Sequence, residues 1–398
     1  MKLKTLKEIK NLKGKKVLLR VDFNVPLKKV GGKIIVADDT RIVAAVPTIN
    51  YLLAAGAKVI LISHLGDPGG KTKADLSLKP IGAALTKILR MQGVAPTDWV
   101  GKKALEKIEA MANGELILLE NLRFHPGEEK NDPKFAEGLA SLADIYVNDA
   151  FATAHRAHAS TAGVTKFLPS YAGFLMEKEI NVLGGLLLNP KKPFIAMIGG
   201  AKISTKIGVI ANLLKKVGQL LLGGALVNNF FKAAGYGIGS SVFEVRELKT
   251  AKKLLANKKI VLPVDFVVGD FKGKKAWVIK VPAKKAELCK KPYAMLDVGP
   301  ETIRKYAQII RKAQTIVWNG PMGYFEIPKY SHGSTALGQL VAARSKGKVF
   351  GVVGGGETIA AIEKTGMAGY IDHISTGGGA MLEFLEGKVL PGIKPLIK

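Results

Sequence analysis

Short apolar runs that alternate with helical patterns constrain the fold of this chain most strongly. In the first half, KVLLRVDF (16–23), KVILISH, ELILLEN and DIYVND are separated by helical stretches, the first over about Thr40 to Ala55. Strands that are apolar throughout and joined by helices are typical of a parallel sheet covered on both faces. Pro47, inside the first helical pattern, is expected to kink the helix or to begin a new turn.

The second half of the chain repeats this pattern with more glycine. The runs FIAMI, QLLLGG, TIVW, VFGVV and HIS each lead to a glycine-containing turn, and the first is followed by a helical pattern over about Ile203 to Lys215. Repeated units of strand, glycine turn and helix predict a second doubly wound sheet. The expected fold class is therefore α/β, with two doubly wound, Rossmann-like parallel-sheet lobes.

One helix is predicted to connect the lobes. The segment FLMEKEINVLGGLLLN (174–189) has an amphipathic pattern. We place an N-terminal domain at 1–173 and a C-terminal domain at 190–386, with the helix as the connector. The tail, 387–398, is extended and too short to be a domain.

Composition narrows the possible classes of protein. A length of 398 residues is comfortable for two domains. The single cysteine, Cys289, excludes an intrachain disulfide and a Cys-based zinc cluster. The longest apolar run, around Leu220 to Val227, is about half of the roughly 20 residues that a membrane helix needs. No apolar segment follows the N-terminal lysines as in a secretory signal, so we expect a cytoplasmic protein with no membrane partner.

The net charge of +28 is the unusual feature of the composition. Such a charge attracts nucleic acid, acidic membranes or polyanionic small substrates. The lysines occur as scattered doublets such as Lys15-Lys16 and Lys284-Lys285, and the few aromatic residues are not interleaved with them. We therefore expect a solvated basic surface without a dedicated nucleic-acid site, whose field draws anions toward any cleft.

Three glycine turns in the second half predict phosphate binding. GGAKISTK (199–206), GGGET (354–358) and STGGGA (375–380) each follow a buried strand. Unpaired N–H groups at a helix start form an anion site, and glycine lets a phosphate approach the backbone. Lys202 and Lys206 are expected on one face of such a helix start. A single glycine turn is weak support, but three in one half favour a phosphate-binding lobe.

A different set of polar residues follows the strands of the first half. Asp22 and Asn24 alternate onto one face and are suited to hydrogen-bonding a hydroxylated substrate. Four basic residues follow strand ends or lie near helix starts, at the edge where α/β folds bind ligands. They are Arg41, His64, Arg123 and Arg156. Each arginine alone is equally compatible with a surface salt bridge.

Patterns for other chemistries are missing. His64, His155 and His158 are interpreted as structural, because no carboxylate or Cys stands at metal-ligand spacing. Cys289 has no neighbouring His, and no GxSxG occurs. The segment GDPGGKT (66–72) is one residue short of a Walker A sequence, and the dinucleotide fingerprint fails as well. Positioning and electrostatics are favoured over covalent catalysis, as in phosphoryl transfer.

A series of segments, in order and with ordinary spacing, resembles the phosphoglycerate kinases nearly from end to end. The segments are VLLRVDFNVP, ADDTRI, LISHLG, ILLENLRFHPGEEKND, VNDAF, TAHRAHAST, GFLMEKE, GGAKISTKIGVI, LPVDFVV, DVGPETI, VWNGPMGYFE and HISTGGGAMLEFLEGKVLPGI. The resemblance implies reversible phosphoryl transfer between 1,3-bisphosphoglycerate and ADP, giving 3-phosphoglycerate and ATP in glycolysis and gluconeogenesis. Such an enzyme is a phosphotransferase with a carboxyl group as acceptor.

The resemblance also implies the roles of the two lobes. The N-terminal domain would bind 3-phosphoglycerate, the C-terminal domain would bind ADP or ATP with Mg²⁺, and hinge bending would bring the ligands together. The tail would pack back on the N-terminal domain. We expect a monomer that acts on these small molecules.

Site residues follow from the resemblance, position by position. On the acid-substrate side they are Asp22, Asn24, Arg41, His64, Arg123 and Arg156. On the nucleotide side they are Gly200, Ala201, Lys206, Gly224, Asn319, Pro321, Glu326, Gly354, Gly355, Gly356 and Glu357, with Glu326 at the ribose and Glu357 as the metal ligand. The groups expected around the transferring phosphoryl are Arg41, Lys202 and the N–H groups near Gly354 and Gly377.

Three positions depart from the family pattern. Asp67 stands where an Arg is usual, which reverses a charge near the substrate phosphate. Glu357 replaces an Asp and changes the reach to the metal, and Ala152 replaces a Gly. Two alternatives stay open: a catalytically impaired nucleotide-binding homologue, or a basic protein with a nucleic-acid-associated role.

Overall fold

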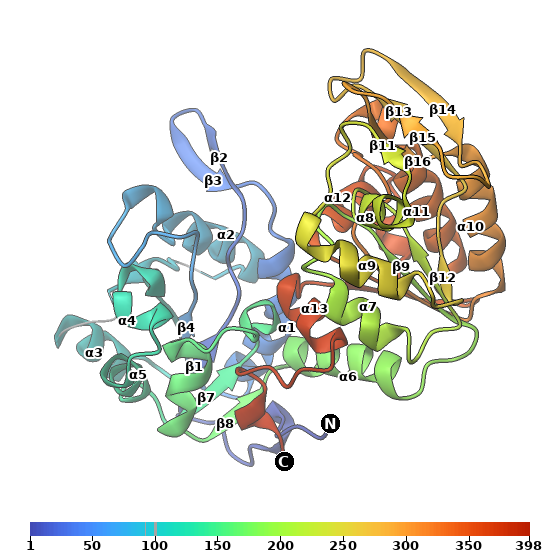
Figure 1. Ribbon diagram of the computed structural model, residues 1–398. Helices are drawn as coiled ribbons and strands as arrows, with labels where there is room; N and C mark the ends of the chain where they lie inside the picture. The colour runs from blue at the N-terminus through green and yellow to red at the C-terminus, as the bar shows by residue number, and fades with distance from the viewer. Residues whose placement is uncertain (92, 99–101) are drawn as a thin grey trace. The chain divides into compact units, whose positions relative to one another are not determined.

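The structure, a computed structural model, describes residues 1–91, 93–98 and 102–398. These residues form two units, each built on a parallel sheet (Figure 1). Unit 1 comprises Met1–Asn181 and Val389–Lys398, and unit 2 comprises Val182–Lys388. The division falls inside α6 (Phe174–Leu188), so the segment predicted as one helix is confirmed as a helix.

Unit 1 contains a six-stranded parallel sheet in the order β5-β6-β4-β1-β7-β8. Its strands are β1 (Lys16–Arg20), β4 (Lys58–Ile62), β5 (Pro96–Thr97), β6 (Leu116–Leu119), β7 (Ile145–Asn148) and β8 (Ser170–Ala172). Its helices are α1 (Thr40–Ala54), α2 (Lys79–Leu89), α3 (Lys102–Glu109), α4 (Pro126–Glu129) and α5 (Pro133–Ala140). The strand order reverses between β1 and β7, so the loops that follow them lie where doubly wound sheets bind ligands.

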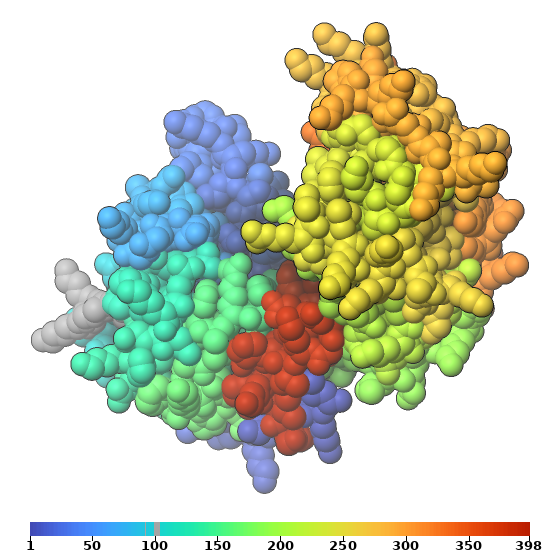
Figure 2. All heavy atoms as spheres, viewed as in Figure 1, coloured from blue at the N-terminus to red at the C-terminus, as the bar shows by residue number. Residues whose placement is uncertain are grey.

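The C-terminal tail belongs to unit 1. Leu3 and Ile397 form a β-bridge, so the two ends of the chain lie side by side (Figure 2). Asn148, at the end of β7, donates a hydrogen bond of 3.1 Å from Nδ2 to the carbonyl of Gly392. Gly392 in turn donates its N–H to Ala154 at 2.8 Å. The tail is thereby fixed to the loop that follows β7.

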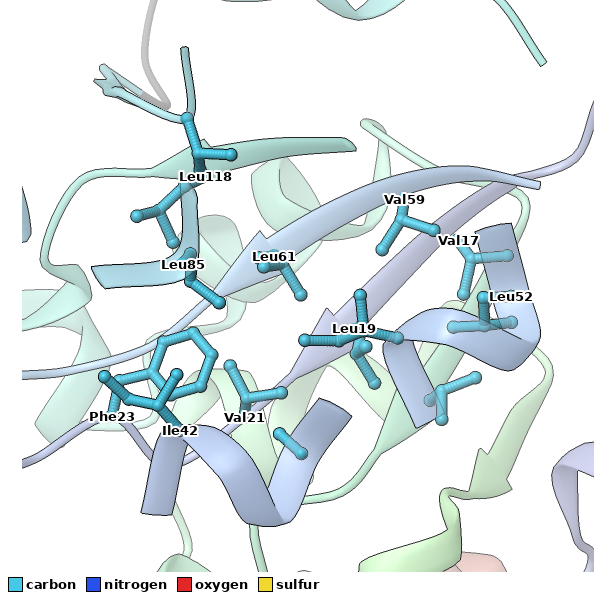
Figure 3. Close-up of a cluster of buried hydrophobic side chains, with 14 of the residues drawn as sticks. Val17, Leu19, Val21, Phe23, Ile42, Leu52, Val59, Leu61, Leu85 and Leu118 are labelled. Atoms are coloured by element: carbon cyan, nitrogen blue, oxygen red, sulfur yellow. The ribbon is translucent and has the colours of Figure 1, made fainter. Parts of the chain in front are cut away.

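Burial on both faces of the unit 1 sheet explains its apolar strands. Val17 and Leu19 pack on one face with Val59 and with side chains of α1 and α2 (Figure 3). Leu18 belongs to the cluster on the opposite face, together with Tyr146. Truncating one such buried Leu to Ala costs about 2–5 kcal/mol of unfolding free energy. The run is apolar throughout because neither face of the strand meets water.

Unit 2 contains a second six-stranded parallel sheet, in the order β12-β10-β9-β17-β18-β19. Its strands are β9 (Phe194–Ile198), β10 (Gln219–Leu222), β12 (Ile260–Val261), β17 (Thr315–Asn319), β18 (Phe350–Gly354) and β19 (His373–Ser375). Its helices are α7 (Ile207–Leu213), α8 (Val227–Ala234), α9 (Leu248–Leu254), α10 (Pro300–Lys312), α11 (His332–Arg344), α12 (Gly356–Glu363) and α13 (Gly379–Leu385). The strand order reverses between β9 and β17, and the fold class predicted from the sequence is confirmed.

Smaller sheets accompany the two large ones. In unit 2, an antiparallel sheet has the order β14-β13-β16, and β11 pairs with β15. Their strands are β11 (Gly237–Ile238), β13 (Asp265–Gly269), β14 (Ala276–Lys280), β15 (Glu287–Cys289) and β16 (Ala294–Val298). Unit 1 has the hairpin of β2 (Leu27–Val30) and β3 (Lys33–Val36). The sequence patterns did not predict these sheets: β2, β3, β11 and β15 are short, and β14 is largely exposed and lacks a buried face.

Two helix predictions have different outcomes. Helix α1 is confirmed and runs through Pro47 without a break, which excludes the alternative of a new turn. The helix predicted from about Ile203 is wrong in its start, because α7 begins at Ile207. Ser204 is held by Glu244, which accepts hydrogen bonds from its backbone N–H at 2.9 Å and from its hydroxyl at 2.6 Å. Such side-chain bonds compete with helix formation.

Within the residues that the structure describes, no helix combines the length and the apolar character needed to cross a membrane.

Candidate active site

Five of the six polar residues predicted on the acid-substrate side form one connected cluster in unit 1. Arg41 Nη1 lies 2.6 Å from Asp22 Oδ2, and Asp22 Oδ1 accepts the N–H of Asn24 at 3.2 Å. Asn24 Oδ1 accepts the N–H of Gly66 at 2.9 Å, while Arg123 Nη1 donates to the carbonyl of Gly66 at 2.7 Å. His64 Nδ1 lies 3.8 Å from Asp22 Oδ1. The cluster therefore joins the loops that follow β1 and β4.

The strand ends explain how these residues meet. β1 stops at Arg20, so Asp22 and Asn24 lie in the loop beyond it, whereas the apolar run predicted a strand to residue 23. His64 follows β4, and Arg123 lies in a 3-10 turn (Leu122–Phe124) after β6. Because the strands are parallel, their carboxyl ends place these loops at one edge of the sheet.

His64 is neutral in this cluster. It is 3% exposed, and burial together with the charges of Arg20, Arg123 and other basic neighbours holds its pKa well below the usual value. Arg20 Nη2 lies 3.2 Å from His64 Nδ1, and a guanidinium can only donate. Nδ1 is therefore the acceptor, and Nε2 carries the ring proton. The contact with Asp22 is consequently no ion pair.

Arg123 keeps one hydrogen-bond donor unused. Its side chain is buried, and Nη2 pairs with Glu129 Oε1 at 3.0 Å. Its Nε has no hydrogen-bond partner among the described residues. Burial lowers the pKa of the Arg123 guanidinium, and the charges of Glu129 and Asp67 oppose this lowering. The exposed Asp67 therefore acts electrostatically on Arg123.

Arg156 joins the cluster only through its field. It is exposed, and the structure gives no ion pair for its side chain within the described residues. Its charge nevertheless contributes to the lowered pKa of His158, which burial and three arginines bring to about 4. The lowered pKa values of His64 and His158 thus indicate a positive electrostatic potential in this region, as an anion site requires.

Sequence reasoning missed a buried network behind this cluster. Arg20 donates from Nε to Ser160 Oγ at 2.9 Å, and Ser160 donates from Oγ to Glu128 Oε1 at 2.6 Å. Glu128 also accepts the N–H of Ser160 at 2.9 Å, and burial raises the pKa of its carboxyl. The sequence did contain one sign of this network, because Arg20 is a charged residue at the end of an apolar strand. Its partners could not be identified, because they are remote in sequence.

Unit 2 holds a cavity of about 360 Å³ at its sheet's reversal point. Six of the residues predicted on the nucleotide side line it: Gly200, Ala201, Gly224, Pro321, Glu326 and Glu357. The other walls are mostly apolar and were not predicted; they include Ala225, Asn228, Val242, Phe271, Met295, Leu296 and Tyr324. Apolar wall residues resemble core residues in sequence, which is why no pattern revealed them. An apolar cavity with few polar groups suits a planar ring.

Glycine is required at the floor of this cavity. Gly224 has φ +65°, and a Cβ there would lie 2.5 Å from the backbone N of Gly200. Gly200 has φ +99° and donates its N–H to the carbonyl of Pro321 at 2.9 Å. Any side chain at Gly224 would therefore separate the loops that follow β9, β10 and β17.

Lys206 and Asn319 lie beside the cavity. Lys206 Nζ donates to Asn319 Oδ1, and Asn319 Nδ2 donates to the carbonyl of Gly354 at 2.8 Å. Burial lowers the pKa of Lys206 to about 8, against the opposing charge of Glu357. This lysine is a cation that a phosphate would stabilise.

Backbone N–H groups of two glycine-containing loops, which follow β18 and β19, lie at the same edge of the sheet as Asn319 at the end of β17. Gly355, at φ +95°, precedes α12, which begins at Gly356 and has Glu357 in its first turn. A Cβ on Gly355 would lie 2.9 Å from Asn319 Nδ2. Gly377 follows β19 and donates its N–H to Ser375 Oγ at 3.1 Å. Helix starts of this kind offer N–H groups to anions.

Lys202 and Lys206 do not share a helix face, which corrects the prediction. Both precede α7, and Lys202 is exposed whereas Lys206 is buried. Lys202 is absent from the lining of the cavity among the described residues, and its charge acts on Glu244 instead. The early turn, held by Ser204 and Glu244, separates the two lysines.

The fold and these two sites define a class: a phosphate-handling α/β protein with a cationic cluster in one unit and a ring-sized, glycine-floored cavity in the other. The class is that of phosphotransferases acting on a nucleotide and a small anion.

Comparisons with known proteins identify the family. The model of the phosphoglycerate kinase family matches residues 6–388. Phosphoglycerate kinase of Moorella thermoacetica is 52% identical over 98% of each chain, and the cytosolic enzyme of Triticum aestivum is 49% identical over 97% of this chain and 96% of its own. The solved structure of phosphoglycerate kinase from Coxiella burnetii is 42% identical, with a TM-score of 0.86 over 99% of each chain. This chain belongs to the phosphoglycerate kinase family.

The activity predicted from the sequence is confirmed with the family. It is a phosphotransferase reaction with a carboxyl acceptor, in glycolysis, with ATP and ADP as nucleotide substrates. The family membership does not assign roles to the individual site residues or to a metal ion, and these roles are proposed below.

Proposed function

We propose that unit 1 binds 3-phosphoglycerate and 1,3-bisphosphoglycerate, and that unit 2 binds ADP and ATP. One observation carries this assignment: buried and half-buried arginines converge in unit 1, whereas the ring-sized apolar cavity lies in unit 2. A small acid needs hydrogen-bonded cations, and a nucleobase needs apolar walls. The domain roles, with the connector at 174–189 and hinge bending, stay predictions.

In unit 1, the residues divide the work of binding the acid. Arg123 offers its free Nε to an anionic oxygen, and Arg156 adds charge from an exposed position. Asp22 and Asn24 offer oxygens to a substrate hydroxyl, while the neutral His64 offers Nε2–H. Arg41, which pairs with Asp22, is proposed to meet the group that is transferred.

In unit 2, the residues orient the nucleotide. The walls around Leu296 and Val242 enclose the base, Glu326 accepts from the ribose, and Lys206 meets a phosphate. The N–H groups at Gly354 to Gly356 and near Gly377 are assigned to the phosphates. Asn319 keeps Lys206 in place through its side-chain carbonyl.

The residues fit a Mg²⁺ that arrives with the nucleotide. No group of three or more His, Cys, Asp or Glu side chains within the described chain could hold a metal alone. Glu357 lines the cavity, and Mg²⁺ is usually held by one or two carboxylates together with substrate phosphates. Bound there, the ion would neutralise phosphate charge during transfer.

Transfer itself needs positioning and charge neutralisation. The phosphoryl group spreads charge over its oxygens, which Arg41, Lys202 and the backbone N–H groups are proposed to stabilise. We further propose a monomeric, cytoplasmic protein, consistent with the cytosolic relative in wheat.

The test is ATP-dependent phosphorylation of 3-phosphoglycerate by the purified chain with Mg²⁺. A Lys202→Ala variant should lose turnover by about 100-fold or more, since removing one such donor costs about 3–4 kcal/mol. The fold should persist because Lys202 is exposed. Lys215→Ala, exposed in the same unit, is the matched control and should be fully active. Near-normal turnover by Lys202→Ala would remove this residue from the proposal.

A further inference from the structure

An exposed basic surface surrounds β14 in unit 2. From Phe271 to Tyr293 the chain has one acidic residue, Glu287. The same span has eight exposed lysines, which are Lys272, Lys274, Lys275, Lys280, Lys284, Lys285, Lys290 and Lys291. Figure 2 shows this segment, in light orange, at the surface. We name residues 271–293 the β14 surface.

An aromatic pair lies within this surface. The Trp277 side chain is 41% exposed, although β14 pairs it with the buried Val268 of β13. Its ring meets that of Tyr293 edge to face, with 4.8 Å between the centroids. Lys275 lies two residues before Trp277, and Lys290 accepts the N–H of Tyr293 through its carbonyl at 2.9 Å. The ring contact therefore joins two segments of the chain that each contain lysines.

This arrangement differs from what the sequence predicted. The sequence predicted a basic surface without interleaved aromatic residues, although FKGKKAW (271–277) and KKPY (290–293) each place an aromatic residue two positions after a lysine doublet. The antiparallel pairing of β13 with β14 and β16 brings the turns together. The structure thus adds the contact between the two segments, through the rings of Trp277 and Tyr293.

The charge of this surface is largely uncompensated. Lys280 pairs with Glu301 at 2.6 Å, and no ion pair joins the other seven lysines to an acid within the described residues. The carboxylate of Asp270 accepts backbone N–H groups from Lys272, Lys274 and Lys275, which shapes the turn between β13 and β14. The ammonium groups are left to face solvent.

We infer that the β14 surface binds single-stranded nucleic acid. Sequence-tolerant binding of single strands combines stacking of bases on aromatic rings with cations along the phosphates, and both are present here. A duplex keeps its bases stacked internally and would leave Trp277 unused. An acidic peptide is less suitable, because it would pair with the lysines but would give the exposed ring of Trp277 no base to stack on. The β14 surface borders the nucleotide cavity at Phe271, but Trp277 and Tyr293 are not among the residues that line the cavity.

The experiment measures binding of a fluorescein-labelled 20-nucleotide oligo-dT by anisotropy over a series of salt concentrations. Saturating ADP is present, so that the cavity of unit 2 is filled. Trp277→Ala should weaken binding by about tenfold or more, since stacking is worth about 1–3 kcal/mol per base. Trp277→Phe should retain most of the affinity. Kinase turnover should be unchanged in both variants.

Charge variants distinguish binding at the β14 surface from binding that results only from the high net charge of the protein. Lys274→Glu/Lys275→Glu should reduce the salt slope by about 0.7 for each phosphate that is no longer neutralised. The matched control is Lys28→Glu/Lys29→Glu, an exposed doublet on the β2–β3 hairpin of unit 1. No aromatic ring among the described residues is recorded against this doublet, and the variant should change the slope little. Equal losses of affinity in both doublets, or undiminished binding by Trp277→Ala, would overturn the inference. Binding of polyglutamate or polyphosphate as tight as that of the oligonucleotide would overturn it as well.

Discussion

Each candidate site contains one buried polar atom without a partner among the described residues, and the two atoms have opposite chemistry. In unit 1 the atom is the donor Nε of Arg123, and in unit 2 it is the acceptor Oδ1 of Asn228. The orientation of the Asn228 amide is fixed, because its Nδ2 donates to the carbonyl of Val242 at 2.9 Å. A buried unsatisfied group costs about 1–3 kcal/mol. Other such atoms occur elsewhere among the described residues, and we propose these two as ligand contacts because they belong to the candidate sites.

The comparison separates two ways of recognising a phosphorylated ligand. Unit 1 presents fixed charges, because guanidinium groups are charged at any ordinary pH and the lowered pKa values of His64 and His158 keep both rings neutral near pH 7. Unit 2 presents backbone N–H groups, apolar walls and a buried cation, Lys206, whose pKa is lowered to about 8 by burial. Binding in unit 1 should therefore depend little on pH, whereas binding in unit 2 should be linked to a proton.

Removing the free donor should have the largest effect. Arg123→Met should raise the KM for 3-phosphoglycerate by about 10- to 100-fold, because a charge-assisted hydrogen bond is worth roughly 1.5–3 kcal/mol. The KM for ATP should stay within about twofold, which distinguishes weakened acid binding from general unfolding. Glu129→Gln is the control: it removes the ion-pair partner but leaves the guanidinium in place. An unchanged KM for the acid would show that the free Nε is not a ligand group.

The free acceptor predicts a smaller effect in the other unit. Asn228→Leu should raise the KM for ADP by about threefold to tenfold, since a neutral hydrogen bond contributes roughly 0.5–1.5 kcal/mol. The KM for 3-phosphoglycerate should not change. A parallel rise in both constants would indicate that Asn228 supports the unit through Val242 rather than contacting the nucleotide.

Reversing the charge of Asp67 should tighten the binding of 3-phosphoglycerate by an amount similar to the loss expected for Asn228→Leu. Asp67→Arg should lower the KM for 3-phosphoglycerate by about threefold to tenfold, because an exposed pair contributes up to about 1 kcal/mol and a reversal counts twice. Asp75→Arg, exposed on the same connection, is the matched control and should have little effect. If both variants lowered the KM equally, the net charge of the protein would explain the change. If Asp67→Arg did not lower the KM, Asp67 would not belong to the site.

The comparison also shows what the sequence can predict. Both large sheets followed from strands such as Val17–Leu19, whose residues are buried on alternate faces. Site residues next to strand ends, such as Asp22 and His64, were likewise within reach, because parallel topology brings strand ends together. Local patterns and a family resemblance are sufficient for features of this kind.

The remaining features depend on contacts between distant segments. Arg20 and Ser160 are 140 residues apart, and no local pattern indicates that they bond. The start of α7 depends on Glu244, which lies 40 residues after Ser204. The two segments of the β14 surface that carry Trp277 and Tyr293 are brought together by antiparallel pairing. In each case the deciding partner is supplied by tertiary structure.

The smallest expected effect tests the proton linkage directly. The folded protein holds the pKa of Lys206 near 8, below its usual 10.5, so between these values the unfolded chain holds a proton that the folded chain lacks. The contribution of Lys206 to stability therefore rises with pH across this range. A bound phosphate favours the ammonium form and should return the proton. At pH 8.5, nucleotide binding should take up as much as about 0.7 of a proton, while 3-phosphoglycerate binding should take up almost none.

Calorimetry in buffers of different ionisation enthalpy measures this uptake. The slope of the binding enthalpy against the buffer enthalpy should be clear for ADP, absent for 3-phosphoglycerate, and abolished for ADP in Lys206→Met. A slope that persists in Lys206→Met would assign the proton to another group. Equal slopes for the two ligands would remove the distinction between fixed charges in unit 1 and a titrating cation in unit 2. Because Asn319 Oδ1 also accepts from Lys206, Asn319→Leu should lower the pKa further and shift the uptake to lower pH.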